Sequence, residues 1–369
     1  MEFVEFTGSA YFRQILSLAT LSGKSVRISK IRQKDEHPGL SDHEISFLRL
    51  LEKVTNGTLI DIDETGTKVT YQPGLLSGGD VEHDCHPDRS ITYYLEALLL
   101  LASFMKKPLN AVLRGVTNDN VDPSVDAVKH STLPLLLKFL GTGEGLNLKV
   151  VKRGLRPNGG GEIHFSCPCR AKLRPLQMKD SGLIRSIRGI AFACKVSPAT
   201  GNRIGESAKK ILKEYVADVY CYTDLCKGPK GGLSPGFGIT LIAETVNGVR
   251  YAVDVCSNPA DSNEEASIPE DLGENAANLL LDEIYRGGSV SSSNQSLALL
   301  LMCLGHRDIS KIQTGQLSPF TIQFVRYIKL FFGVEFRLSG DEVSEDAEKG
   351  KVTFTCVGIG YSNLNKTVS

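Results

Sequence analysis

The sequence lacks the features that mark membrane and secreted proteins. The apolar run around Leu98 to Ala102 is far shorter than the roughly 20 residues that a membrane-spanning helix needs. The N-terminal stretch MEFVEFTGSA has neither a basic segment nor a long apolar segment, so we expect no secretory signal. Because both the long apolar run and the signal segment are missing, we expect no membrane partner. The sequence also has no run of five or more basic residues that would mark a nuclear import signal.

The chain also lacks net charge and a disulfide framework. It carries 42 basic and 42 acidic residues, so its overall charge does not indicate a nucleic-acid partner. Its nine cysteines have no framework-like spacing, which favours a reducing compartment such as the nucleus or the cytosol. What it does have is 369 residues, 41% of them hydrophobic. That is enough for a large core and more than one typical domain of roughly 100–200 residues.

Charge is unevenly distributed along the chain. Residues 149–188 contain ten basic and two acidic side chains, a net charge of +8, whereas residues 254–283 contain nine acidic side chains and no lysine or arginine. The first stretch could attract phosphate and the second a basic partner. Two solvated faces whose charges cancel would give the same pattern.

A repeated order of predicted elements runs through the chain. The order helix, strand, helix, strand, strand occurs over residues 11–73, 91–167 and 294–360, which suggests duplication. In the first copy Ser41 and Glu44 predict a capping box, and in the second we expect a helix over 122–140 with Pro123 in its first turn.

Between the second and third copies, strands and helices alternate over residues 184–287, which indicates an inserted α/β segment. We therefore predict an α/β fold with one domain built from repeats, residues 1–183 and 288–369, and a smaller inserted α/β domain, residues 184–287. Residues 339–350 have the composition of a solvated acidic loop.

A glycine triplet follows a cluster of basic residues in the segment VVKRGLRPNGGGEI. Its backbone could form an anion-binding nest with the help of basic neighbours, or simply a tight hairpin turn. It is not a phosphate-binding loop of the Walker type, because no Gly-Lys-Ser/Thr ends it and it joins two strands. The candidate anion- or RNA-binding residues are Lys152, Arg153, Arg156, Gly159, Gly160 and Gly161.

Other candidate chemistries are weaker. His83, Cys85 and His86 in EHDCH could ligate zinc, but no second ligand pair has matching spacing, so we expect no metal. No cysteine and histidine stand in a nucleophile arrangement, and we expect no cofactor. Asp119, Asp122 and Asp126 surround a helix start, where acidic residues are expected for capping.

The segment RGLRPNGGGEI, residues 153–163, resembles the signature of the RNA 3′-terminal phosphate cyclase family at every position. HPGLSDHEISFLRLLEKVTNG, TYQPGLLSGGDVEHDC, RGVTNDNVDPSVD, NQSLALLLMCLG and CVGIGYSNL look like the cyclase-like ribosome-assembly branch of that family. The resemblance extends from Gly8 to Leu364. It implies repeated βαβαββ units with a smaller inserted α/β domain.

The resemblance also bears on chemistry. Cyclases of this family form a covalent adenylate on a histidine that opens a helix near the C-terminal repeat. In GQLSPFTIQF, residues 315–324, Ser318 stands where that histidine would be, and no histidine follows His306. A neutral imidazole can attack the α-phosphorus of ATP directly, whereas a serine hydroxyl needs a base to activate it. Ser318 before Pro319 is more typical of a helix N-cap.

The resemblance therefore implies a non-cyclase. We expect a ribosome biogenesis factor that acts in early precursor cleavages toward 18S RNA and the 40S subunit, within the small-subunit processome. Its expected location is the nucleus and nucleolus. Its expected partners are precursor ribosomal RNA and a large nucleolar GTPase.

Two alternatives stay open. The chain could be an endoribonuclease, with Arg326 and Lys329 stabilising the developing phosphorane charge, although no convincing base lies beside them in the sequence. It could also be a protein scaffold that never contacts RNA and docks through the acidic stretch 254–283.

Overall fold

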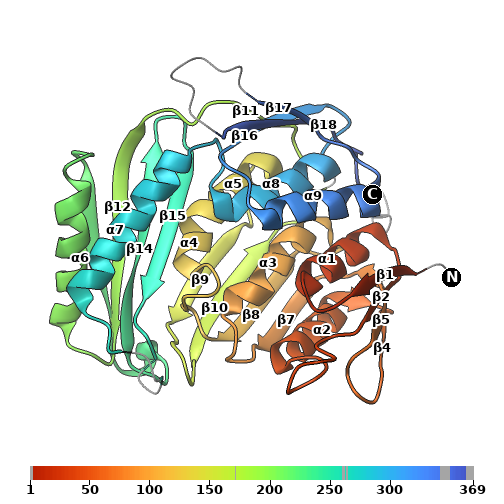
Figure 1. The fold of residues 1–369 in the computed structure, drawn as a ribbon, viewed down its shortest axis with the longest axis horizontal. Helices are drawn as coiled ribbons and strands as arrows, with labels where there is room; N and C mark the ends of the chain where they lie inside the picture. Colours follow the sequence, from red (N-terminus) through yellow and green to blue (C-terminus); the bar gives the residue numbers. More distant parts are fainter. Residues whose placement is uncertain (1–2, 171, 260–261, 263–264, 341–349, 363–369) are drawn as a thin grey trace.

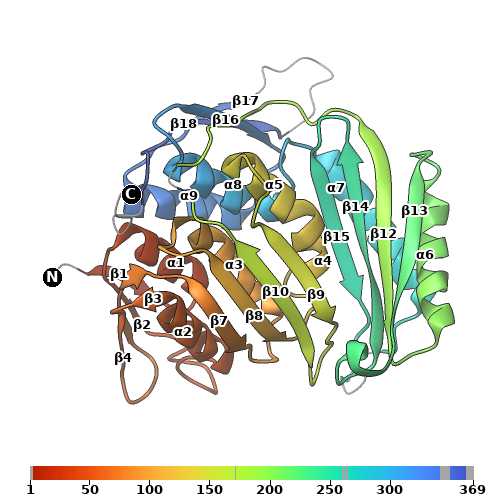
Figure 2. The same cartoon turned by 180° about the vertical axis from the view of Figure 1, so that it is seen from behind.

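The computed structural model describes residues 3–170, 172–259, 262, 265–340 and 350–362. Three four-stranded sheets surround a central group of helices, and a fourth four-stranded sheet lies beside them (Figures 1 and 2). Over the described residues, the longest and most apolar helices still fall short of what a membrane crossing requires.

The first unit pairs β1 with β2 in parallel, and its remaining two strands are added antiparallel in the order β1-β2-β5-β4. A small two-stranded sheet, β3 with β6, closes the end of the unit. Its elements are β1 (Val4–Thr7), α1 (Phe12–Ser22), β2 (Val26–Ser29), α2 (Asp42–Val54), β3 (Thr55–Asn56), β4 (Leu59–Ile62), β5 (Val69–Gln72) and β6 (Leu75–Leu76).

The second unit repeats this pattern in the order β7-β8-β10-β9, again with the first pair parallel. Its elements are β7 (Gly79–Asp84), α3 (Ile91–Leu101), η1 (Ala102–Phe104), β8 (Leu109–Gly115), α4 (Val125–Ala127), η2 (Val128–Thr132), α5 (Leu133–Leu140), β9 (Asn147–Lys152) and β10 (Gly161–Cys167).

The third unit has the order β11-β16-β18-β17, with β11 parallel to β16. Its first strand precedes the inserted segment in the chain and the rest follows it. Its elements are β11 (Gln177–Met178), η4 (Ser292–Asn294), α8 (Gln295–Leu304), β16 (Ile309–Thr314), α9 (Pro319–Phe332), β17 (Arg337–Gly340) and β18 (Val352–Val357).

The inserted segment forms its own sheet, in the order β13-β12-β14-β15, and α6 and α7 cover one of its faces (Figures 1 and 2). Its elements are β12 (Ile184–Cys194), α6 (Pro198–Leu212), β13 (Val219–Cys226), η3 (Gly228–Gly231), β14 (Gly236–Thr245), β15 (Arg250–Cys256) and α7 (Pro269–Arg286).

The predicted fold class is confirmed: three βαβαββ units share one strand order, and a smaller α/β segment interrupts the third. The insertion does not simply precede the last unit, because β11 comes before it. That two-residue strand is too short to produce an alternating pattern in the sequence. The exact domain boundaries stay a prediction.

Two separate cores hold these layers together. One joins the helices and sheets of all three units, and the other lies between the inserted sheet and its two helices. Helices α3 and α8 are buried on nearly all sides because almost every residue in them is apolar. A small third cluster, Leu155 with Phe192, Cys194, Cys226 and Cys256, joins the second unit to the inserted sheet.

The local predictions had mixed outcomes. The capping box of Ser41 and Glu44 is present at α2, as predicted. The helix expected over 122–140 instead begins at Val125, with Ser124 as its N-cap and Pro123 outside it, and a wider turn at η2 interrupts it. Most of the predicted acidic loop at 339–350 lies outside the described residues.

Candidate functional site

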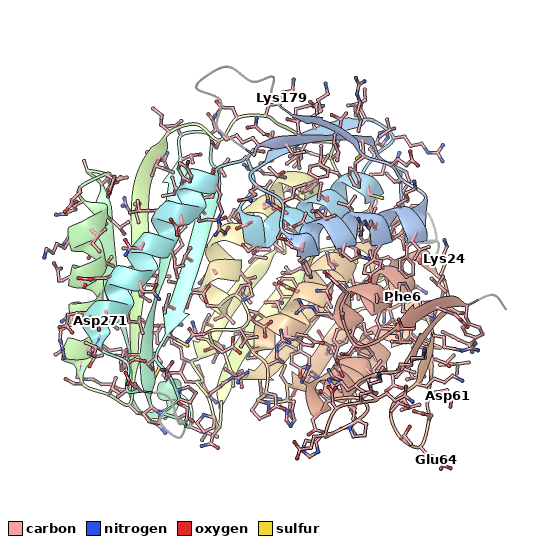
Figure 3. The ribbon with its side chains drawn as sticks, viewed as in Figure 1. Phe6, Lys24, Asp61, Glu64, Lys179 and Asp271 are labelled. Carbon is pink, nitrogen blue, oxygen red and sulfur yellow. The ribbon has the colours of Figure 1, made fainter. Side chains whose placement is uncertain are left out.

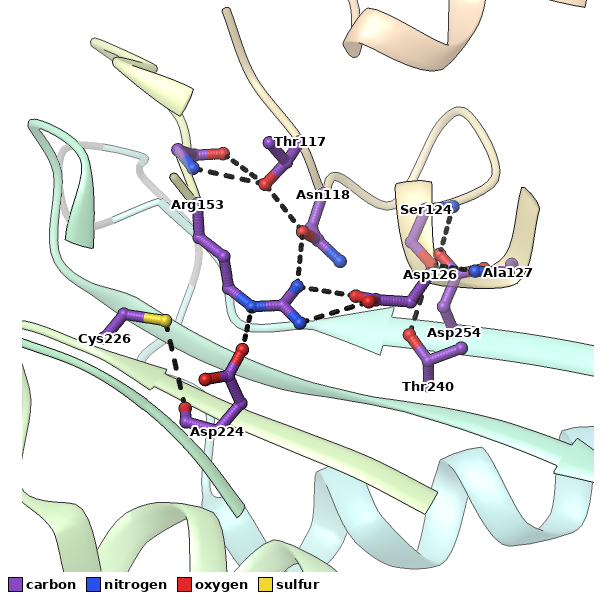
Figure 4. Close-up of polar contacts among 11 residues, drawn as sticks. Thr117, Asn118, Ser124, Asp126, Ala127, Arg153, Asp224, Cys226, Thr240 and Asp254 are labelled. Atoms are coloured by element: carbon purple, nitrogen blue, oxygen red, sulfur yellow. Dashed lines mark hydrogen bonds and ion pairs between the residues drawn. The ribbon is translucent and has the colours of Figure 1, made fainter. Parts of the chain in front are cut away.

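Arg153 lies at the centre of a buried polar network between the second unit and the inserted sheet (Figure 4). Its guanidinium donates to both carboxylate oxygens of Asp126, at 2.5 and 3.1 Å, and to Asp224 at 2.8 Å. It also lies over the ring of Phe192, 4.9 Å from the ring centroid. Only 4% of the residue is exposed, so its charge is directed at protein carboxylates and away from solvent.

The electrostatics of this network follow from burial and pairing. Burial alone would lower the pKa of Arg153, but Asp126 and Asp224 raise it above its ordinary value. Burial alone would raise the pKa of Asp126, and Arg153 lowers it below its ordinary value. Arg153 thus stays charged, and each charge depends on the other to be stable in the interior.

The neighbouring carboxylates are not helix caps, which corrects the sequence interpretation. Ser124 caps α4 by accepting from the amide of Ala127 at 3.1 Å. Asp122 accepts two hydrogen bonds from Arg89, and Asp126 pairs with Arg153. These arginines lie 27 or more residues from the carboxylates they bind, so no short sequence pattern reveals the pairing. From the sequence alone, helix capping was therefore the expected role.

Asp119 closes the loop after β8. Its Oδ1 accepts from the amides of Val121 and Asp122 at 3.0 and 2.8 Å. Burial raises the pKa of Asp119 above its ordinary value, although these bonds oppose the shift. Its other oxygen lies 3.4 Å from the guanidinium of Arg156, which also donates to the carbonyl of Asp88. Arg156 is therefore held across the mouth of this loop.

The glycine triplet packs where three backbone segments meet. A Cβ on Gly154 would lie 2.2 Å from the amide nitrogen of Gly161 and 2.6 Å from the carbonyl of Gly115. Gly159 has φ +62° and donates its amide to the carbonyl of Leu155 at 2.8 Å. Gly160 has φ +80°, and a Cβ there would lie 2.7 Å from Leu233. This geometry favours the tight-turn interpretation; anion binding by Gly159, Gly160 and Gly161 stays a prediction.

The loop that packs on this turn carries lysines. The amide of Arg153 donates to the carbonyl of Lys230 at 3.0 Å, and the amide of Leu233 donates to the carbonyl of Gly159 at 3.0 Å. Lys195 donates its ammonium to the carbonyl of Leu233 at 2.9 Å. We name the following residues the lysine group: Lys152, Lys195, Lys227 and Lys230. Over the described residues, none of the four forms an ion pair with a carboxylate. Lys195, Lys227 and Lys230 are exposed and Lys152 is half-buried.

The basic window at 149–188 does not form one positive face. Arg153, Arg156, Arg185 and Arg188 each pair with a carboxylate from another part of the chain. The acidic stretch is likewise reduced, because Glu270 pairs with Arg203 and Glu283 lies 3.8 Å from the guanidinium of Arg286. Spatial pairing has cancelled much of the linear charge pattern.

The residues predicted on α9 lie elsewhere. Ser318 is the N-cap of α9, as predicted, and accepts from the amide of Thr321 at 3.1 Å. Arg326 donates to Gln323 at 3.2 Å, and Lys329 pairs with Glu335 at 2.7 Å. Helix α9 packs against α1 and α8, whereas the glycine turn packs against the inserted segment, so the two candidate sites are not brought together.

The metal candidate at 82–86 is engaged in other contacts. His83 is buried and hydrogen-bonded to Ser46 at 3.0 Å, and burial lowers its pKa to about 4. Burial also raises the pKa of the Cys85 thiol well above its ordinary value. Within the described part of the chain, no three side chains of the ligating types converge on a metal-sized site.

Comparison with known proteins places this geometry in a family. The family model described as RNA 3′-terminal phosphate cyclase matches residues 4–338. The chain belongs to this family. It is 55% identical over 366 residues to the human protein named RNA 3′-terminal phosphate cyclase-like protein, covering 99% of this chain and 98% of that one.

More distant relatives also align with this chain over nearly its whole length. A fruit-fly protein named probable RNA 3′-terminal phosphate cyclase-like protein is 51% identical, covering 98% of this chain and 97% of that one. A fission-yeast protein named rRNA processing protein rcl1 is 41% identical, covering 98% of each chain. Family membership is therefore shown along nearly the whole length.

Sequence reasoning missed two sets of residues in this family member. Asp126 and Asp224, the partners of Arg153, come from segments that only the tertiary fold brings together. Lys227 and Lys230 lie in the segment KGPKGGLSPGFG, whose glycines and prolines indicate a loop. A signal was thus present for the lysines, since a basic, flexible loop is a candidate phosphate contact, but nothing in the sequence linked it to the glycine triplet.

Proposed function

We propose that this protein is a ribosome biogenesis factor that associates with precursor ribosomal RNA and does not cyclise RNA ends. The finer parts of the proposal are a role in early processing toward 18S RNA within the small-subunit processome, a nuclear and nucleolar location, and a nucleolar GTPase as a partner. A fission-yeast relative named for rRNA processing supports the general role.

The observation that carries the negative part is the state of Ser318. The family resemblance places the adenylated histidine at this position. Here the serine hydroxyl accepts from the Thr321 amide and contacts the Thr321 hydroxyl at 3.1 Å. Thr321 in turn donates to Gln295 at 2.9 Å, so the Ser318 side chain is part of a capping network, and among the hydrogen bonds of the described residues none joins its hydroxyl to a base.

The RNA contact is proposed to run over the lysine group. Ammonium groups without a carboxylate partner bind phosphate oxygens and release counterions from RNA. Lys152 and Arg156, two of the anion-binding candidates from the sequence, would contact RNA phosphates together with Lys195, Lys227 and Lys230. Arg153 and the three glycines would hold the surface in shape, because the first is occupied by carboxylates and the others by backbone packing.

RNA binding is tested by reversing charge on this surface. The double variant Lys227→Glu/Lys230→Glu is compared with Lys210→Glu/Lys213→Glu at the C-terminal end of α6, which changes net charge equally at exposed sites of the same inserted segment. We expect the first to weaken binding to a precursor RNA fragment. It should also lower the slope of log affinity against log salt by roughly one for each lost phosphate contact. Equal behaviour of the two variants would favour a protein scaffold that docks through the acidic stretch 254–283.

The non-cyclase part is tested by incubation with labelled ATP. We expect no covalent adenylate on the protein and no cyclised RNA ends. In cells, depletion is expected to reduce mature 18S RNA, and unchanged 18S maturation would contradict the processing role.

Endoribonuclease activity stays the second candidate function. Lys329 is drawn toward Glu335, and Arg326 contacts only Gln323 among the hydrogen bonds of the described residues. Cleavage of a precursor fragment by the purified protein, lost on Arg326→Ala and Lys329→Ala, would establish it.

A further inference from the structure

Two cysteines face each other at the ends of neighbouring strands in the inserted sheet. Cys194 is the last residue of β12 and Cys226 the last of β13, and the two are register partners in this parallel pair. Register partners carry their side chains on the same face of a sheet. Both side chains belong to the small buried cluster that joins the second unit to the inserted sheet. We name Cys194 and Cys226 the thiol pair.

The spacing of the strands suits a disulfide within the thiol pair. Neighbouring strands lie about 4.7–4.9 Å apart, which falls inside the range of about 4.4–6.8 Å between the Cα atoms of a disulfide. Cys256, the third cysteine of the cluster, is excluded by the same measure. It lies on β15, which β14 separates from β12. Two strand spacings are about 9–10 Å, beyond the roughly 7 Å above which a bridge requires backbone movement.

The two thiols differ in reactivity because of the contact between them. A hydrogen bond from Cys194 lowers the pKa of Cys226 below its ordinary value, against the opposing effect of burial. The same contact, together with burial, raises the pKa of Cys194 above its ordinary value. Cys226 also donates to the carbonyl of Asp224 at 3.9 Å, beside the Arg153 network (Figure 4). Since the thiolate is the form that attacks an oxidant, Cys226 is the sulfur that reacts first.

Cys226 is also the thiol that a small oxidant can reach. Strand β13 is an edge strand, paired with β12 alone over the described residues, and Lys227 after it is exposed. Cys226 is 5% exposed, whereas Cys194 has no exposed surface. The end of an edge strand opens with little loss of buried contact, so hydrogen peroxide can enter there without global unfolding. The thiol pair therefore has one sulfur placed for attack and one placed behind it.

We propose that Cys226 and Cys194 form a reversible disulfide when a hydroperoxide reaches the end of β13. The Cys226 sulfur attacks one peroxide oxygen, the O–O bond breaks, and with hydrogen peroxide the products are a sulfenic acid and water. The Cys194 sulfur then attacks the sulfenic sulfur, the S–O bond breaks, and a second water leaves. The two thiol protons leave in the two waters. The two sulfurs lose two electrons, which reduce the two peroxide oxygens.

The bond acts as a redox-sensitive brace under the lysine group. Lys195 directly follows Cys194, and Lys227 directly follows Cys226. Joining the two strand ends fixes these lysines relative to each other and closes the chain between residues 194 and 226 into a loop. A closed loop has less conformational freedom in the unfolded state, which stabilises the folded inserted segment. The disulfide does not depend on the proposed function, although the lysines that it braces are those proposed to contact RNA.

The test uses the full chain, treated with hydrogen peroxide, blocked with iodoacetamide and digested for mass spectrometry. We expect one cross-linked pair of peptides, containing Cys194 and Cys226, which dithiothreitol separates. Cys194→Ser and Cys226→Ser are each expected to abolish this pair. Cys221→Ser and Cys256→Ser are the matched controls and should retain it, because Cys221 lies on the same strand opposite Gly189 and Cys256 lies two strands from β12.

A second measurement separates the chemistry from an effect on folding. In Cys194→Ser the reaction is expected to stop at the sulfenic acid of Cys226, which dimedone labels. Peroxide is expected to raise the thermal unfolding midpoint of the parent and to leave that of Cys194→Ser unchanged. Absence of the bridge in the folded parent, or a bridge to Cys256, would overturn the inference. If the bridge forms but RNA does not bind, the proposed function falls alone. If RNA binds but no bridge forms, the disulfide proposal falls alone.

Discussion

The first and second units place a strand-to-strand connection at the same point of the repeat, and the two connections differ sharply. In the first unit, β4 and β5 are joined by a short turn in which Asp63 accepts from the amide of Lys68 at 2.8 Å. Glu64 at its tip points into solvent (Figure 3). In the second unit, residues 153–160 join β9 and β10, and Arg153 is buried there.

The difference follows from what covers each connection. The first turn is defined mainly by hydrogen bonds within itself, and its outside contact is with the preceding loop, where the amide of Ile31 donates to the carbonyl of Thr67 at 3.0 Å. The second packs against the inserted segment, through Arg153 with Asp224 and through Gly160 with Leu233. The second connection thus forms part of the interface with the inserted segment. Its residues, such as Arg153 and Gly160, must fit that segment as well as form the turn.

The largest expected effect comes from Arg153→Met. The change leaves Asp126 buried without its cation, and breaking a buried ion pair costs about 3–5 kcal/mol. The free energy of unfolding, measured by denaturant titration, is expected to fall by that amount. The matched control is Arg188→Met, whose pair with Asp218 is exposed, with an expected loss of at most about 1 kcal/mol.

A second variant separates charge from shape at this site. Arg153→Met combined with Asp126→Leu removes both buried charges and is expected to recover part of the loss, because well-packed apolar replacements of a buried pair are often neutral. If the single variant were as stable as the control, Arg153 would not be the centre of this interface.

Glycine substitutions in the two connections give the next effect. Gly154→Ala would place a Cβ within 2.2–2.7 Å of backbone atoms of three other glycines, which cannot move aside. We expect a loss of about 3 kcal/mol. Gly66→Ala, in the first turn, meets nothing closer than 3.4 Å and is strained only by its φ of +68°. Its expected cost is about 1 kcal/mol. Equal thermal shifts would show that the two turns are equally constrained.

These contrasts show how far the sequence reaches. The order of elements and the N-cap of α9 were predictable because hydrophobic periodicity and capping are local properties. The buried role of Arg153 was not, because its partners lie 27 and 71 residues away. A linear charge count treats Arg153 and Arg188 as free cations, when the fold supplies a carboxylate to each. Lys227 and Lys230 show the reverse, since only the fold brings them beside the glycine turn.

The smallest expected effect concerns the dependence of stability on pH. Asp254 lies on β15 where the second unit packs, and accepts from the amide of Ser124 at 3.1 Å. Burial raises its pKa from 3.8 to about 7. Between these values the folded protein keeps a proton that the unfolded chain has released. The contribution of Asp254 to the free energy of unfolding therefore falls as pH rises from about 4 to about 7.

Asp254→Asn is expected to remove this fall, since an amide oxygen can still accept from Ser124 and does not titrate. Part of the Asp254 side chain lies at a cleft, where water reduces the effect, so we expect a gain of about 1 kcal/mol at pH 8 and none at pH 4. Asp218→Asn tests the sign. Arg188 lowers the pKa of Asp218, so removing that carboxylate is expected to reduce stability at neutral pH. If the free energy of unfolding changed with pH in the same way in both variants, burial between the second unit and the inserted sheet would not have raised the pKa of Asp254.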